Sequence, residues 1–156
     1  MSTNTQMYDA LTIADAMLKI GKRKGQTMTP MKLLKLVYIA HGFSLALLNR
    51  DLFQNRIEAW KFGPVIPDLY QATKRFGREE IPLNLIGDPE DTSVDPEVQS
   101  FLEDVYEKYG HLNGIQLSYL THQSGTPWDQ VYDPRFRNEP IPDDLIADHY
   151  RGMLVA

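Results

Sequence analysis

The feature that most constrains the fold is a nearly continuous apolar segment, residues 31–48, which follows Thr29 and Pro30. A threonine side chain accepts hydrogen bonds from the free N–H groups at a helix start, and proline suits the first turn, so a helix is expected to begin here. Its apolar residues occupy most of the helical circumference: Leu33, Leu34, Leu36, Val37, Ile39, Ala40, Phe43, Leu45, Ala46 and Leu47. A helix that is apolar on nearly every side has to be covered by other elements. The segment is therefore predicted to be the central buried helix.

Further helices are predicted to cover it. One carries an apolar stripe at helical spacing and ends at the glycine-flanked basic run 21–25; the stripe is Ala10, Ile13, Ala14, Met17 and Leu18. The others are expected from Pro64 to Lys74, Pro96 to Gly110, Asn113 to His122 and Pro142 to Met153. One or two further helical turns are expected from Thr126 to Val131, and short strands around Arg56–Lys61 and Ile81–Ile86. A length of 156 residues fits one domain. The predicted fold is mostly α, a compact single domain over residues 1–156 with five to six helices and at most two short strands.

Composition narrows the class of protein. The chain has no cysteine, so a disulfide framework, a cysteine zinc site and a thiol nucleophile are excluded. No uninterrupted apolar stretch approaches the roughly 20 residues that span a bilayer, and the polar first nine residues do not resemble a secretory signal. A cytoplasmic location and no membrane association are expected.

The net charge of −5 combines a basic first half (+5 over residues 1–80) with an acidic second half (−10 over residues 81–156). Such an asymmetry can mark an interaction surface.

The residues reveal no recognisable active site. The four histidines show no zinc-binding spacing, and neither glycine-rich phosphate-binding pattern is present, so no metal and no cofactor are predicted. His41 is interpreted as a packed, hydrogen-bonded core residue. In the sequence, hydroxyls lie near the imidazole of His122 at Ser118, Tyr119, Thr121 and Ser124, but catalysis also requires them to meet in space. The apolar second helix does not suit DNA reading, which needs a polar recognition helix.

Two parts of the chain resemble the Panacea antitoxin domain, the family of GepA-like and SocA-like phage-associated proteins. The first is residues 32–42, KLLKLVYIAHG, followed by Leu52-Phe53 and the segment 57–65, IEAWKFGPV, with Tyr70 and Gly77 beyond it. The second comprises Leu120-Thr121-His122, Gly125 and Pro127-Trp128. The resemblance extends over about residues 9–147. Val37, Ile39 and His41 depart from the family pattern, which has leucine, phenylalanine and glutamine at these positions.

The resemblance implies a non-enzymatic antitoxin of a prophage-associated toxin–antitoxin system, which neutralises a cognate toxin protein by direct binding. Alternatives are an adaptor that delivers the bound partner to a protease and a small nucleic-acid-binding regulator that uses the basic first half. Binding to nucleic acid is the less favoured of these, because the acidic second half would repel phosphates. A homodimer is weakly favoured, because the aromatic residues outnumber those that the expected core accommodates.

The motif residues are expected to form the scaffold rather than the contact surface. They are Tyr38, Glu58, Trp60, Gly63, Pro64, Tyr70, His122, Pro127 and Trp128. Trp60 and Trp128 are predicted to pack together at the centre of the core. The partner-binding candidates are two charged surface segments, the basic helix end (Lys22, Arg23, Lys24) and the acidic loop (Asp88, Glu90, Asp91).

Overall fold

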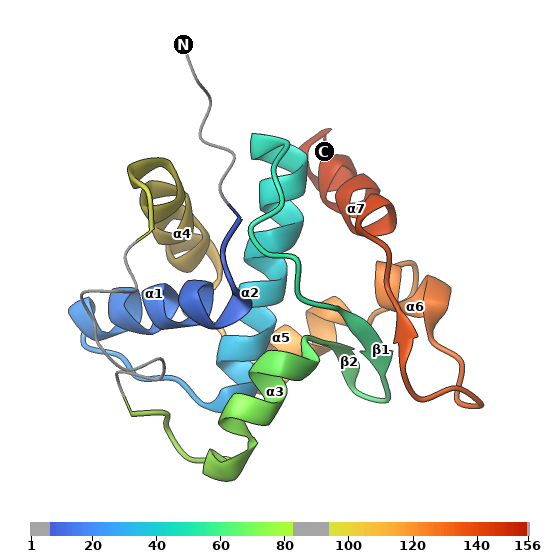
Figure 1. Ribbon diagram of the computed structural model, residues 1–156, viewed down its shortest axis with the longest axis horizontal. Coiled ribbons are helices and arrows are strands. Elements are labelled where there is room, and N and C mark those ends of the chain that lie inside the picture. The colour runs from blue at the N-terminus through green and yellow to red at the C-terminus, as the bar shows by residue number, and fades with distance from the viewer. Residues whose placement is uncertain (1–6, 83–93, 156) are drawn as a thin grey trace.

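The computed structural model describes residues 7–82 and 94–155. Within these ranges the chain forms seven α-helices and one small three-stranded sheet (Figure 1). In chain order the elements are α1 (Ala10–Arg23), α2 (Pro30–Phe43), the π-helical segment η1 (Ser44–Leu48), β1 (Glu58–Trp60), β2 (Gly63–Val65), α3 (Pro67–Thr73), the 3-10 turn η2 (Lys74–Phe76), α4 (Pro96–Tyr109), α5 (Gly114–Thr121), α6 (Pro127–Val131), β3 (Glu139–Pro140) and α7 (Asp143–Val155). The mostly α fold is confirmed, although the described residues form seven helices where five to six were expected. Of the three strands, only β1 lies where a strand was predicted.

Helix α2 is the centre of the molecule, as predicted. Every residue from Leu33 to Phe43 is buried, and α1, α3, α4, α5, α7 and β2 all contact the helix. Figure 1 shows α2 running through the middle, with α1 crossing it, α4 on one side and α7 on the other. By length and composition alone, Pro30–Leu48 could cross a membrane, but 67% of its apolar window is buried inside this fold. Its hydrophobicity is that of a core helix.

Local capping chemistry accounts for most helix boundaries. The side chains of Asp9, Thr29, Asp95 and Thr126 each accept a hydrogen bond from a backbone N–H in the first turn of the following helix. Asn113 forms a reciprocal capping box with Gln116. Such caps satisfy N–H groups that have no partner within the helix. The predicted starts at Thr29, Asp95, Asn113 and Thr126 are correct.

The prediction of a helix beginning at Pro64 is wrong. Residues Gly63–Val65 form β2, which pairs antiparallel with β1, Glu58 opposite Val65 and Trp60 opposite Gly63. Gly63 has a φ of 117°, which side-chain-bearing residues rarely adopt, and this allows the chain to reverse direction. Proline is tolerated because β2 is an edge strand. Helix α3 begins three residues later than expected, at Pro67.

The sheet is completed from a distant part of the chain. Strand β3 pairs antiparallel with the other side of β1, giving the order β2-β1-β3. The strand expected over residues 81–86 lies mostly outside the described residues, and its first two residues, Ile81 and Pro82, are in no strand. The Ile81 N–H instead donates to the Met28 carbonyl at 2.8 Å.

Helix α7 packs against α2 through Tyr150. Its ring meets Phe43 edge to face at a centroid distance of 4.7 Å and lies directly over Gly42. A Cβ atom at position 42 would overlap the Tyr150 ring at Cδ2 and Cε2, so only glycine allows this approach. The close contact fixes the position of the last helix.

We therefore expect Gly42→Ala to lower the free energy of unfolding by about 1–3 kcal/mol, because an added methyl overpacks the contact with Tyr150. Gly152→Ala in the exposed part of α7 is the matched control, since a Cβ there meets nothing within 4 Å. It should be neutral or stabilise by up to about 1 kcal/mol. Urea denaturation measures both, and equal stabilities for the two variants would contradict this account of the packing.

Candidate functional site

The motif residues meet around the hairpin formed by β1 and β2. Four helices reach it, each with one side chain: Lys35 from α2, Tyr70 from α3, Ser118 from α5 and Trp128 from α6. Segments that are far apart in sequence thus surround one short reversal of the chain. Of the motif residues, Tyr38 lies apart from it, buried in the core beside Tyr150.

Lys35 holds the hairpin from beneath. Its side chain is 3% exposed, and Nζ donates to the carbonyl oxygens of Pro64 at 2.8 Å and Phe62 at 3.4 Å. The Ser118 hydroxyl donates to the same Phe62 oxygen at 2.8 Å. Within the described part of the chain no carboxylate pairs with Lys35, and burial lowers the pKa of its ammonium to about 7. Sequence reasoning did not select Lys35, although a lysine on the apolar face between Leu34 and Leu36 was a signal.

The side chains of Glu58 and Trp60 on β1 are hydrogen bonded to each other. The indole N–H of Trp60 donates to Glu58 Oε1 at 2.9 Å, and Arg56 forms an ion pair with Glu58 Oε2 at 2.9 Å. The Trp60 ring meets Tyr70 edge to face, with centroids 5.0 Å apart. These contacts connect the hairpin to α3.

Trp128 closes the other side of the hairpin. Its indole N–H donates to the Trp60 carbonyl at 2.5 Å, and its ring stacks on Tyr132 at 4.6 Å and meets His122 edge to face at 5.4 Å. Both tryptophans are only partly buried and pack at the edge of the core. The prediction that Trp60 and Trp128 pack together at the centre of the core is wrong, because each indole N–H binds an acceptor on the hairpin.

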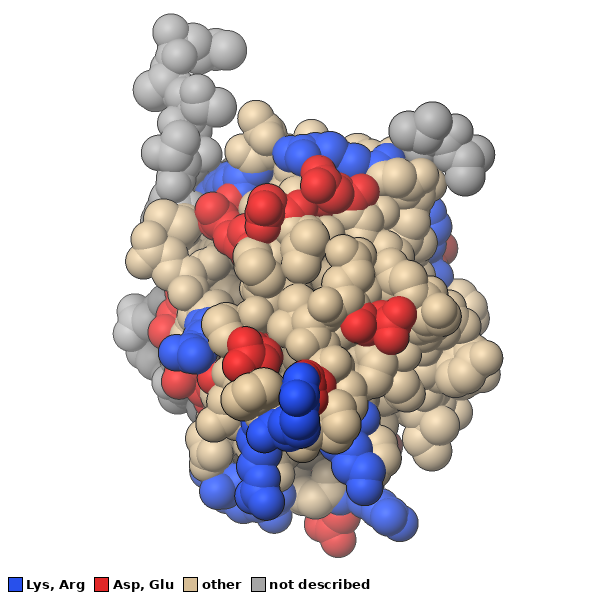
Figure 2. Space-filling view, turned by 90° about the vertical axis from the view of Figure 1, so that its right-hand side faces the viewer, with Lys and Arg blue, Asp and Glu red and all other residues tan. Residues whose placement is uncertain are grey.

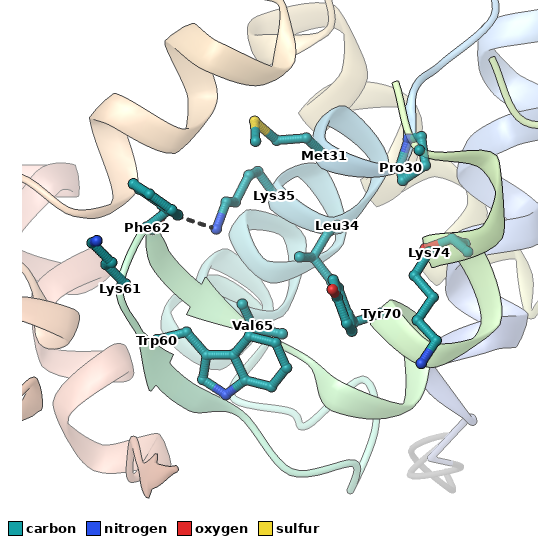
Figure 3. A pocket seen from close by; sticks show the side chains of 12 residues that line it. Pro30, Met31, Leu34, Lys35, Trp60, Lys61, Phe62, Val65, Tyr70 and Lys74 are labelled. Atoms are coloured by element: carbon teal, nitrogen blue, oxygen red, sulfur yellow. Dashed lines mark hydrogen bonds between the residues drawn. The ribbon is translucent and has the colours of Figure 1, made fainter. Parts of the chain in front are cut away.

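A pocket of about 370 Å³ lies between α2, the hairpin and α3 (Figure 3). Apolar and aromatic side chains form most of its wall, Lys35 lines it, and Lys61 and Lys74 stand at opposite ends. The lining contains no Asp or Glu; it consists of Pro30, Met31, Leu34, Lys35, Trp60, Lys61, Phe62, Val65, Tyr70, Thr73, Lys74 and Gly77. The arrangement suits an apolar group that carries negative charge.

A second hollow, of about 430 Å³, adjoins the first across Trp60 and Lys61. It too has no acidic residue in its lining, which is completed by Tyr132, Pro134, Phe136, Arg137 and Asn138. We call the two hollows together the hairpin face. Its apolar side chains are well exposed, Phe62 by 66% and Phe136 by 52%. Figure 2, which views the side of α6 and α7, shows Lys and Arg gathered at the lower end of this side, whereas Asp and Glu lie mostly over its upper and middle parts.

Of the two predicted partner-binding segments, the described one lies away from the hairpin face. Lys22, Arg23 and Lys24 are exposed at the end of α1, on the opposite side of the molecule from the hairpin in Figure 1, and Lys24 contacts Glu107 at 3.5 Å. Asp88, Glu90 and Asp91 lie outside the described residues. The basic helix end remains a candidate, but the hairpin face combines charge with exposed apolar area.

One set of side chains has donor types that bind metals. His41, Asp51 and Asp143 place ligand atoms within 4.8 Å of one another. His41 is 1% exposed, its Nε2 is 3.0 Å from Asp143 Oδ1, and its ring stacks on Phe53. Its Nδ1 has no hydrogen-bond partner, whereas a metal-bound histidine ordinarily donates through its second ring nitrogen. We interpret the set as a structural contact, in which His41 of α2 hydrogen bonds to Asp143 of α7. The prediction of a packed, hydrogen-bonded His41 is confirmed.

Comparison with known proteins identifies the family. Residues 33–129 match the family model described as "Antitoxin SocA-like, Panacea domain". The chain is 29% identical to "Antitoxin SocA" of Caulobacter vibrioides (strain NA1000 / CB15N) over 171 aligned positions, which cover 100% of this chain and 89% of that protein. No solved structure is significantly similar. The chain belongs to the family of SocA-like antitoxins with a Panacea domain.

The buried amine of Lys35 should make stability depend on pH. Its pKa is about 7 in the fold and 10.5 in the unfolded chain, so between these values the unfolded chain binds more protons and stability rises with pH. From pH 7 to pH 9 we expect the free energy of unfolding to gain about 2 kcal/mol from this group. Lys35→Met should abolish that gain, and exposed Lys22→Met should retain it. Urea denaturation at each pH tests this, and parallel profiles for the two variants would contradict it.

Proposed function

We propose that this member of the Panacea-domain family is a cytoplasmic antitoxin that neutralises a cognate toxin protein by binding it directly, without turnover. The observation that carries the proposal is the hairpin face, where exposed apolar and basic side chains surround a rigidly held reversal of the chain. Family membership supports the antitoxin role, and this surface supports direct contact as its means.

The orientation of the motif residues favours a scaffold role for the motif. Glu58, Gly63 and Pro64 are buried, whereas Lys61 and Phe62, at the turn between the strands, are exposed. Specificity is a difference of affinities set by local contacts, so it is expected at exposed positions. Lys61 and Phe62 are therefore the first residues we assign to toxin contact.

The hydroxyl groups near His122 favour a non-enzymatic role. The Ser118 hydroxyl donates to the Phe62 carbonyl, and the Thr121 hydroxyl lies 3.0 Å from the carbonyl oxygens of Leu117 and Ser118. His122 Nδ1 is itself hydrogen bonded to the Ser118 carbonyl. A catalytic hydroxyl has to be held by its general base, and here both hydroxyls and this ring nitrogen are engaged with backbone oxygens instead.

The proposal predicts that this chain rescues growth when the neighbouring open reading frame is induced as the toxin, and that the two proteins co-purify. Phe62→Ala should weaken the complex at least tenfold and reduce rescue, because truncating a central aromatic contact commonly costs about 2 kcal/mol or more. Met153→Ala, which removes an exposed apolar side chain from α7, should behave as wild type. Growth curves and affinity purification from the surviving cells provide both measurements.

The amount of partner protein separates neutralisation from its alternative. A stable partner in rescued cells supports direct neutralisation, and a partner that disappears during rescue supports delivery to a protease. A harmless neighbour that does not co-purify would contradict the antitoxin proposal. Rescue by Phe62→Ala equal to wild type would exclude the hairpin face while leaving the antitoxin role intact.

A further inference from the structure

We propose that the hairpin face binds an acidic segment of the partner protein, and that this segment inserts an aromatic or large aliphatic side chain into the pocket between α2, the hairpin and α3. The inference rests on the proposed function in one respect only, that the partner is the toxin. The chemistry of the bound segment follows from the shape and charge of the surface.

The pocket has the size and wall for one large apolar side chain. Its volume of about 370 Å³ falls within the roughly 300–1,000 Å³ of typical ligand pockets. Leu34, Trp60 and Tyr70 form the wall, and Phe62 stands at the rim with 66% of its surface exposed (Figure 3). An inserted apolar side chain would pack against the exposed Phe62 ring, and both would be shielded from water.

The charges around the pocket are of one sign. Lys61 and Lys74 stand at its two ends, and Arg137 extends the positive charge into the second hollow. The chain has 21 acidic residues and a net charge of −5, yet none of those in the described ranges 7–82 and 94–155 lines either hollow. Complementary charge guides association and excludes wrong partners, so a face of this kind selects a negatively charged segment.

The buried ammonium of Lys35 is a second feature that favours a negatively charged ligand. An ammonium has three N–H groups, and within the described residues only the Phe62 and Pro64 carbonyls accept from it. A buried cation without a counter-ion is costly. A partner carboxylate that reached the pocket would supply the missing counter-ion and favour the charged form of Lys35.

The surface suits protein better than nucleic acid. Two lysines and one arginine are exposed across the two hollows, with aromatic and aliphatic side chains between them. Proteins that hold duplex DNA through its backbone commonly make about 6–10 phosphate contacts. Exposed aromatic and arginine side chains around a pocket are instead typical of protein interfaces.

The test lets the protein select its own ligand. The full chain is immobilised, and 12-residue random peptides displayed on phage are selected on it. The enriched peptides are then synthesised with a fluorescent label and titrated against wild type, the double variant Lys61→Glu/Lys74→Glu and the matched control Lys22→Glu/Lys24→Glu. All four lysines are exposed, and both doubles change the net charge equally; circular dichroism verifies that each is folded.

We expect enriched peptides that are acidic and contain an aromatic or large aliphatic residue. Lys61→Glu/Lys74→Glu should weaken them at least tenfold, Phe62→Ala at least fivefold, and Lys22→Glu/Lys24→Glu less than twofold. No enrichment, enrichment of basic or uncharged peptides, or equal binding to the two double variants would overturn the inference. So would a 20-base-pair DNA duplex that binds the same face more tightly than the peptides.

The selection uses no toxin, so its outcome is independent of the growth assay. If acidic peptides bind the hairpin face but the chain does not rescue growth, the binding site is supported and the antitoxin proposal is rejected. Rescue by a chain that fails the peptide test would retain the antitoxin role and place the toxin on another surface.

Discussion

The burial of α2 from Leu33 to Phe43 is the constraint on which the rest of the structure depends. Within that segment a basic side chain needs a partner, since an unpaired buried charge is costly. Two basic residues of α2 lie there, Lys35 and His41, each at most 3% exposed. Lys35 binds the backbone of the hairpin and His41 binds Asp143 of α7. Lys35 thus connects α2 to the hairpin, and His41 connects it to the last helix.

Local signals were sufficient for the helices and insufficient for the sheet. Thr29 and Asp95 cap the helices that follow them as their sequence context indicates, because capping acts within one turn. Gly63-Pro64 reads locally as a break followed by a helix start, yet it forms a strand. The strand is stabilised by its pairing with β1 and by the hydrogen bond from the Lys35 amine to the Pro64 carbonyl. Both contacts depend on residues outside the Gly63-Pro64 segment, so its local sequence does not reveal them. Strand β3 is two residues long and contains a proline, so it carries no local strand signal at all.

The tryptophans show why the candidate site was only half predictable. Their positions in the motif predicted a structural role, which agrees with their packing against the core. Their placement at its centre was wrong because an indole N–H needs an acceptor when it is buried. The acceptors here are the Glu58 carboxylate and the Trp60 carbonyl, and both belong to the hairpin. The need for a hydrogen bond thus draws both rings to the hairpin and away from the centre.

The way the hairpin is fastened explains how one fold can carry different contact surfaces. Lys35, Ser118 and Trp128 all donate to backbone carbonyl oxygens of the hairpin, not to its side chains. A backbone oxygen is present whatever residue occupies its position, so these bonds do not depend on the side chains at positions 61 and 62. Those side chains point outward and can change without loosening the turn that presents them. A motif whose Glu58, Gly63 and Pro64 are buried can in this way keep the hairpin in place while the residues at its tip are selected for the partner.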